Sequence, residues 1–186
     1  MSQQLRLPIL LVCLLIALPG QVMFHELGHV LVARLMGDPE ATLLLAPRES
    51  AGTLWIGAAH YDGATLSPVG QILAPLGGLL LTQCAAWALL VGSARWPQRA
   101  RTYAAVVVGA FLLDVPAQVV WALIAEVAQP PHLSGIDLAD VMSVVHGWTG
   151  VSVFGMKGGL LLLLAGYGLV GWYALRRRFG GRSWAA

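Results

Sequence analysis

The feature that most constrains the fold of this chain is the length of its uncharged runs. Residues 63–94 contain no Asp, Glu, Lys or Arg, and neither do residues 7–24. A helix needs about 20 apolar residues to cross the hydrocarbon core of a bilayer. With 58% hydrophobic residues and a mean hydropathy of +0.74, the 186-residue chain has few polar side chains with which to cover a soluble domain. We therefore predict a membrane protein rather than an unusually apolar soluble one.

The uncharged runs belong to four segments that are long and apolar enough to be membrane-spanning helices: residues 7–36, 65–93, 102–125 and 156–175. We predict an all-α polytopic membrane protein in which residues 1–186 form one integral membrane domain. A secretory signal peptide is the alternative interpretation of residues 7–20, because an arginine precedes this apolar core and a Pro-Gly pair ends it. We favour a spanning helix, since the apolar helical pattern continues beyond that pair.

Two connections between these segments have structure of their own. Residues 38–62 contain two short apolar stretches separated by the turn-prone sequence PRESAG, which predicts a β-hairpin at or in the membrane. An interfacial loop with incidental hydrophobic residues is the alternative. The second connection, residues 127–149, contains a possible short helix from Ile136 to Val145.

The distribution of charge predicts the sidedness of the chain. In a four-span arrangement most of the basic residues lie on one side of the membrane. The acidic residues within segments 38–62 and 126–140 lie on the other side. By the positive-inside rule both termini are then cytoplasmic. Nucleic-acid binding is not expected, because the basic clusters are short and border apolar runs. The first cluster is Arg95, Arg99 and Arg101, and the second is Arg176, Arg177, Arg178 and Arg182.

The sequence HELGH, residues 25–29, ends the first apolar run with three titratable side chains. Residues four apart project from one face of a helix, so His25 and His29 can reach one ion. Glu26 then lies beside the ion without ligating it, where it can take a proton from water. Zinc suits this motif, because its catalytic sites use three protein ligands, and it lowers the pKa of a bound water to about 7. Hydrogen-bonded core histidines are the alternative, but they leave the buried glutamate unexplained.

A third ligand is needed, and Asp114 is the only other carboxylate within the four apolar segments. His25 lies twelve residues before Gly37, and Asp114 lies twelve residues before Glu126. At a rise of 1.5 Å per residue, both lie about 18 Å from helix ends on the same side. We therefore predict Asp114 as the third ligand. A structural hydrogen bond or a proton relay is the alternative role, and Pro116 predicts a kink close by.

With HELGH near the end of a first span and an aspartate on a later span, the chain resembles the site-2 protease family of intramembrane zinc metalloproteases, and most closely its small bacterial members. The resemblance implies zinc bound by His25, His29 and Asp114, with Glu26 as general base and acid. It implies hydrolysis of peptide bonds in or near the membrane spans of other proteins, in the cytoplasmic membrane of a bacterium. The small-residue segment 67–81 is similar to the span beside that family's active site, and the hairpin resembles the segment that presents substrate as an added strand.

The chain departs from the family pattern in two respects. Asp114 is followed by Val115 and Pro116 where the family often has glycine, and the sequence contains no asparagine. An oxyanion must then be stabilised by a group other than an asparagine side chain. Backbone N–H groups, Gln118 and Gln71 are the alternatives.

The remaining polar residues outside the spans carry weaker signals. We expect Asp137 and Asp140 to form a polar helix face or an N-terminal cap, with a rim or second metal site as the alternative. We expect His60, His132 and His146 to be solvated or interfacial rather than ligands.

Two other functions fit the same residues. A transporter or channel could bind a passing metal ion or proton with the HELGH side chains and Asp114, although the chain lacks the repeated halves typical of transporters. A catalytically inactive relative could act as a membrane scaffold. The expected partners are the lipid bilayer and a membrane-protein or peptide substrate.

Overall fold

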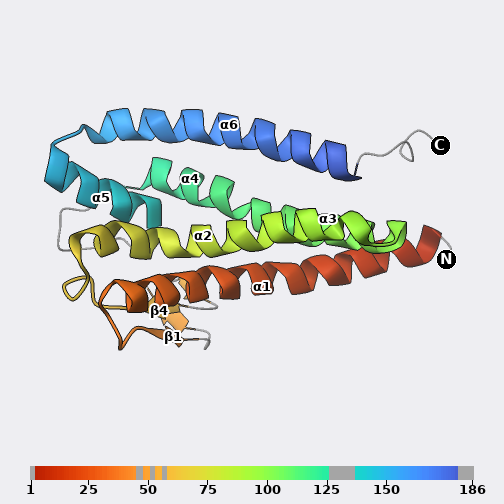
Figure 1. Cartoon of the computed structure of the whole chain (residues 1–186), viewed down its shortest axis with the longest axis horizontal. Coiled ribbons are helices and arrows are strands. Elements are labelled where there is room, and N and C mark those ends of the chain that lie inside the picture. The colour runs from red at the N-terminus through yellow and green to blue at the C-terminus, as the bar shows by residue number, and fades with distance from the viewer. Residues whose placement is uncertain (1–2, 45–47, 51–52, 56–57, 126–136, 180–186) are drawn as a thin grey trace.

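The computed structural model describes residues 3–44, 48–50, 53–55, 58–125 and 137–179. Its long helices run along one axis, and the start of α1 and the end of α6 lie at the same end of the molecule (Figure 1). The elements in chain order are α1 (Gln3–Met36), β1 (Thr42–Leu44), β2 (Arg48–Ser50), β3 (Thr53–Trp55), β4 (Ala58–His60), α2 (Pro68–Gly92), the short 3-10 helix η1 (Ser93–Arg95), α3 (Gln98–Leu112), α4 (Asp114–Ile124), α5 (Asp137–Thr149) and α6 (Val153–Phe179).

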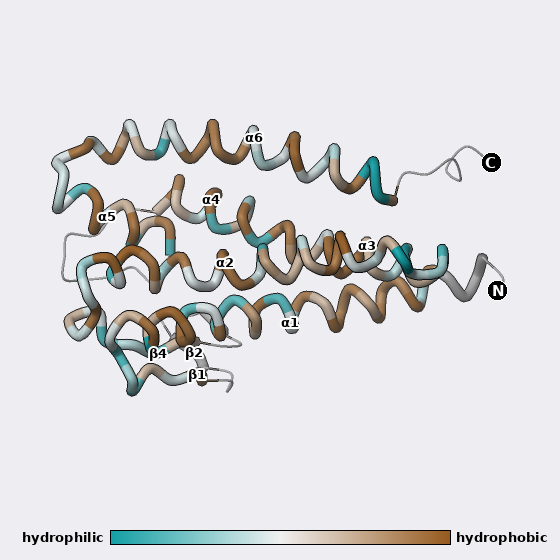
Figure 2. Tube along the Cα trace, in the orientation of Figure 1, coloured by the Kyte–Doolittle hydropathy of each residue, from teal (hydrophilic) through white to brown (hydrophobic). Residues whose placement is uncertain are grey.

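The described structure has four helical segments that are long and apolar enough to cross a membrane: Leu7–Met36, Pro68–Arg95, Ala100–Ile124 and Val153–Phe179. They confirm the four helices that the uncharged runs predict. Apolar residues continue around these helices rather than forming one buried stripe (Figure 2). Ile16 is 70% exposed and Leu162 is 78% exposed, so the bundle presents large apolar side chains outward. Extensive exposed apolar surface of this kind is typical of a protein that contacts lipid.

The predicted hairpin is confirmed between the first two long helices. Strand β1 pairs antiparallel with β4, and β2 pairs antiparallel with β3. Asp38 holds the base of the hairpin, because its two carboxylate oxygens accept hydrogen bonds from the backbone N–H groups of Glu40 at 3.0 Å and Asp62 at 2.7 Å. The inner side chains of β1 and β4, Leu43 and Ala59, pack against buried residues of α1 and α2. The hairpin therefore lies against α1, close to the HELGH sequence.

The third long segment is divided at Leu113 into α3 and α4, near the proline that predicts a kink. Pro116 has no N–H to donate to the carbonyl group of Leu112, one helical turn earlier. The hydroxyl group of Tyr167 on α6 lies 3.0 Å from that carbonyl oxygen and 2.6 Å from the side-chain oxygen of Gln83. The break is thus satisfied by a side chain of another helix, and it places Asp114 in the first turn of α4.

Helices α1 and α2 approach each other at two glycines. A Cβ atom added to Gly28, within HELGH, would lie 2.2 Å from the carbonyl oxygen of Gly77, and one added to Gly77 would lie 2.4 Å from that of Gly28. Both neighbours are backbone atoms, which cannot move aside as the end of a side chain can. This contact sets the distance between HELGH and the small-residue part of α2.

We expect the variant Gly28→Ala to unfold at a lower temperature than the wild type in detergent. The added methyl group overfills a packed contact, which typically costs about 1–3 kcal/mol. Gly20→Ala is the matched control on the same helix, since nothing lies within 4 Å of its added Cβ and alanine favours a helix over glycine. Equal thermal midpoints for the two variants would contradict the close approach of α1 and α2.

Candidate metal centre

The two histidines of HELGH lie one helical turn apart on α1 and face the interior of the bundle. His25 is 5% exposed and His29 is 4% exposed. Their ring centroids are 4.8 Å apart. The placement of both imidazoles on one helix face agrees with the prediction from their spacing.

The carboxylate that lies between the two imidazoles belongs to Asp137, the first described residue of α5. One of its oxygens is 2.7 Å from Nε2 of His25, and the other is 3.3 Å from Nε2 of His29. Ligand atoms of these three residues all lie within 4.8 Å of one another, close enough to hold one metal ion. Two buried imidazole nitrogens and a partly buried carboxylate oxygen make a ligand set that fits zinc.

Asp114 also reaches His25, but on the opposite side of the ring. Its Oδ2 atom is 2.8 Å from Nδ1 of His25 and accepts a hydrogen bond of 2.5 Å from the hydroxyl group of Thr82. The structure thus brings Asp114 to the HELGH helix, as its depth predicts. The group of ligand atoms contains Asp137 instead, which we expected to belong to a polar helix face or a cap.

The hydrogen-bond partners of the two Nδ1 atoms determine which nitrogen of each neutral imidazole carries the proton, and so whether Nε2 has a lone pair available for a metal ion. Nδ1 of His29 is 2.8 Å from the carbonyl oxygen of Ala74, and a carbonyl oxygen can only accept, so this nitrogen carries the proton. With Asp114 as acceptor, the same assignment follows for His25. In the neutral rings both Nε2 lone pairs then face the carboxylate of Asp137. Acceptors that face one another across a few ångströms are stabilised by a cation between them.

The charge of Asp137 fits this role. Burial by itself would raise the pKa of Asp137. Without a metal ion, imidazoles that carry a proton on Nε2 donate hydrogen bonds to this carboxylate and attract its charge, and these effects of His25 and His29 outweigh burial and hold the pKa of Asp137 below the ordinary value. A metal ion would take the place of the two Nε2 protons. Asp137 is therefore ionised at neutral pH, which is the form that binds a metal ion.

Glu26 lies outside the group of ligand atoms, as its position in the motif predicts. Its side chain is half-buried, and its Oε2 atom accepts a hydrogen bond of 2.7 Å from the backbone N–H of Ala59 on β4. Because its acceptor Glu26 lies on α1, this N–H is directed from β4 toward α1. The glutamate therefore connects the helix that carries the histidines to the hairpin.

Helix α4 contributes a second polar side chain to the centre. Nε2 of Gln118 lies 3.3 Å from Nε2 of His25. Gln118 follows Asp114 by four residues, so the two project from one face of α4 and bracket the imidazole of His25 on its two nitrogens. Between the two glutamines considered from the sequence, Gln118 has a contact with the histidine pair, whereas Gln71 lies in the first turn of α2.

Space for an ion is left by a glycine of α2. A Cβ atom added to Gly78 would lie 2.7 Å from Nε2 of His25 and 2.7 Å from Nε2 of His29. Any side chain at this position would thus occupy the region in which the two ligand nitrogens converge. The small-residue part of α2 both permits the close approach to α1 and keeps the centre open.

Tyr61, next to β4, covers the other side of His29. Its ring is stacked on that of His29 at a centroid distance of 6.4 Å. Burial, followed by the nearby negative charges of Asp137, Asp140 and Glu26, raises the pKa of Tyr61. Its hydroxyl group therefore keeps its proton at neutral pH. Sequence patterns alone did not indicate this residue.

The other histidines lie apart from the metal-capable group that the described residues form. His60 is exposed on β4, and Nδ1 of His146 is 2.8 Å from the carbonyl oxygen of Val151. His132 lies outside the described residues. The expectation that His60 and His146 are not ligands agrees with these positions.

No protein-family model, curated protein or solved structure matches this chain. What the chain does is therefore inferred from the residues and geometry of the centre itself.

Proposed function

We propose that the chain is an intramembrane zinc metalloprotease, which hydrolyses peptide bonds in or near the membrane-spanning segments of other proteins. The observation that carries this proposal is the group formed by the buried His25 and His29 with the partly buried Asp137, and Glu26 is adjacent on the helix of the two histidines. Titratable groups are costly to bury within apolar helices, so they are seldom there without a function. The resemblance of HELGH and its setting to site-2 proteases supports the same reaction.

In this proposal His25, His29 and Asp137 hold the zinc ion, and Asp114 is a positioning residue. A carboxylate that accepts from the outer nitrogen of a ligating histidine fixes the tautomer and orientation of the ring. The 2.8 Å contact between Asp114 and Nδ1 of His25 is of this kind, and the carbonyl group of Ala74 serves His29 in the same way. This assignment differs from the one that the family resemblance implies, in which Asp114 itself is the third ligand.

The reaction needs a base, an acid and a donor for the developing oxyanion. A bound zinc ion supplies Lewis acidity, which polarises the scissile carbonyl group and lowers the pKa of water to about 7. Glu26 takes a proton from the attacking water and returns it to the leaving amine. The amide of Gln118, 3.3 Å from Nε2 of His25, is placed to donate a hydrogen bond to the oxyanion.

The position of the hairpin favours a peptide substrate that binds in an extended conformation. The N–H of Ala59 donates to Glu26 on α1, so β4 presents a backbone donor beside the centre to which an added strand could pair. Glu26 occupies this N–H in the described structure. A peptide that pairs with β4 would replace Glu26 at Ala59 and leave its carboxylate available for proton transfer.

The metal dependence of the purified protein tests the proposal. We expect about one zinc ion per chain, cleavage of a co-expressed reporter that contains a membrane span, loss of cleavage on chelation, and recovery with zinc. Zinc at 100 times its dissociation constant should also stabilise the folded state by about 2.7 kcal/mol, which thermal unfolding measures independently of activity.

Each alternative function has its own outcome in the same experiment. Zinc uptake into sealed vesicles without cleavage would indicate a transporter. A protein that is purified without zinc, gains no stability from added zinc and cleaves nothing would indicate a scaffold. Either result would overturn the proposed protease.

A further inference from the structure

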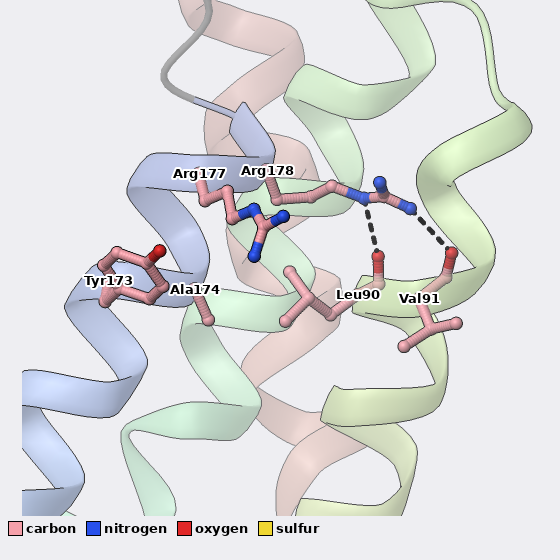
Figure 3. Close-up of a pocket in the computed structure, with 6 residues that line it drawn as sticks. All are labelled: Leu90, Val91, Tyr173, Ala174, Arg177 and Arg178. Atoms are coloured by element: carbon pink, nitrogen blue, oxygen red, sulfur yellow. Dashed lines mark hydrogen bonds between the residues drawn. The ribbon is translucent and has the colours of Figure 1, made fainter.

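A groove lies between the C-terminal ends of α2 and α6, and none of the residues that line it belongs to the metal centre. We call it the Arg177 groove, and it has a volume of about 470 Å³. It lies at the end of the molecule where α1 begins and α6 ends (Figure 1). The residues that line it are Leu90, Val91, Tyr173, Ala174, Arg177 and Arg178 (Figure 3).

Arg178 forms a fixed wall of the groove. Its guanidinium group donates to the carbonyl oxygens of Leu90 at 3.1 Å and Val91 at 2.8 Å. Both carbonyl groups also accept from Ser93, at the end of α2, so Arg178 adds a second donor to each of them and connects α6 to α2. Its charge is therefore already engaged by the protein.

Arg177 has no comparable partner among the residues that the structure describes. Its side chain is exposed and extends from α6 into the space in front of α2, beside Leu90 (Figure 3). A guanidinium group is always charged, and it binds phosphate groups with two parallel hydrogen bonds. The groove thus presents the guanidinium group of Arg177, which is available for a ligand, next to that of Arg178, which is already bound to α2.

The rest of the groove is apolar and opens outward. Val91 is 69% exposed and Tyr173 is 64% exposed, whereas Leu90 is 6% exposed and forms the floor. Both helices are among the four that are long and apolar enough to cross a membrane. If they span the bilayer, the arginines at their ends lie at the level of the lipid headgroups, and the apolar wall continues into the hydrocarbon region.

We propose that the Arg177 groove binds an anionic phospholipid of the surrounding membrane. The phosphate group binds the guanidinium group of Arg177, and an acyl chain lies along Leu90, Val91 and Ala174. Basic pockets between spanning helices on the cytoplasmic side are suited to anionic headgroups. The apolar walls select a lipid over a free phosphate ion. This inference uses the membrane insertion in the proposed function but does not depend on zinc or on catalysis.

A bound lipid would stabilise the position of α6. One face of this helix packs on the bundle through partly buried side chains such as Leu164 and Tyr167, whereas Leu162 and Leu169 are exposed on its outer side. A lipid that contacts both α6 and α2 adds to the connection made by Arg178. We therefore expect an anionic lipid to raise the thermal midpoint of the protein more than a zwitterionic lipid does.

The experiment compares lipid binding by the wild type, Arg177→Gln and Arg176→Gln in detergent. Phosphatidylglycerol and phosphatidylcholine are titrated separately, and the bound lipid is counted by native mass spectrometry. One arginine near a membrane surface contributes about 1 kcal/mol to binding of anionic lipid, so Arg177→Gln should weaken phosphatidylglycerol binding roughly fivefold. Arg176→Gln removes the same charge from a neighbouring residue outside the groove and should have a much smaller effect.

A second variant tests the apolar wall without changing the charge. Val91→Trp fills the outward side of the groove, and we expect it to weaken phosphatidylglycerol binding although all three arginines remain. Equal effects of the two arginine variants, no preference for phosphatidylglycerol in the wild type, or competition by inorganic phosphate at equal concentration would overturn the proposal.

Zinc content and cleavage measured on the same samples separate the two proposals. Selective lipid binding by a protein without peptidase activity would overturn the proposed function alone. An active peptidase without lipid preference would overturn the lipid site alone.

Discussion

Glu26→Gln is expected to abolish cleavage while the purified protein keeps its zinc. The glutamine cannot take a proton from water, and general base catalysis typically contributes about 10²–10⁴ in rate. Zinc is retained because Glu26 is not part of the ligand group of His25, His29 and Asp137. The measurements are zinc content by mass spectrometry and the rate of cleavage of a reporter with a membrane span.

The structure makes this substitution a specific test of proton transfer. Oε2 of Glu26 accepts from the N–H of Ala59 at 2.7 Å, and the amide oxygen of glutamine can accept the same hydrogen bond. The hairpin should therefore stay docked on α1. Glu40→Gln, at an exposed position next to the hairpin, removes the same charge and should leave the rate unchanged. Undiminished cleavage by Glu26→Gln would rule out Glu26 as the base.

Asp137→Asn and Asp114→Asn should differ sharply in zinc affinity. Loss of a partner that only orients a ligating histidine costs about 10–100-fold in metal affinity. We expect a loss of this size for Asp114→Asn, whose side chain contacts Nδ1 of His25 at 2.8 Å. Asp137→Asn removes a negatively charged ligand between the two Nε2 atoms, so its loss should exceed about 100-fold. Competition with a chelator of known affinity measures both values.

The opposite ranking would have an equally clear meaning. If Asp114→Asn loses zinc and Asp137→Asn keeps it, Asp114 is the third ligand, as the family resemblance implies, and Asp137 is a neighbour of the centre. Asparagine preserves the shape of each side chain. Thermal unfolding of both variants without zinc would show whether a loss of zinc comes from the site or from the fold.

Much of the architecture could be predicted because it depends on local patterns. Uncharged runs longer than a bilayer crossing predicted the four long helices, and the turn-prone residues 47–52 between two apolar stretches predicted the hairpin. The spacing of His25 and His29 predicted two imidazoles on one helix face. Each of these inferences needs only the geometry of a single element.

The depth argument for Asp114 shows where such reasoning stops. Counting residues along two helices places His25 and Asp114 at similar heights, and the structure brings them into contact at 2.8 Å. Residue counting does not determine which nitrogen of the imidazole the carboxylate meets, because that depends on the rotation of α4 about its own axis. This rotation follows from packing of α4 against other helices.

The role of Asp137 as a ligand could not be predicted from the sequence for a related reason. It lies at the start of a short helix, 108 residues after His29, where an acidic residue usually caps the helix. The lowered pKa of Asp137, caused by contacts from His25 and His29, exists only once α5 is packed against the bundle. One signal was available in the sequence. Asp114 is followed by valine, whereas the family's ligand aspartate is often followed by glycine, and this difference was a reason to look for the third ligand among other carboxylates.

The sequence by itself determined the four apolar helices, the hairpin and the two histidines with their glutamate, because helical and strand periodicities are properties of neighbouring residues. Only the tertiary structure decided which carboxylate faces the Nε2 atoms, which glutamine reaches His25 and why Gly78 has no side chain. Those features arise where α1, α2, α4 and α5 meet, and the directions of side chains across such a junction depend on how the helices pack.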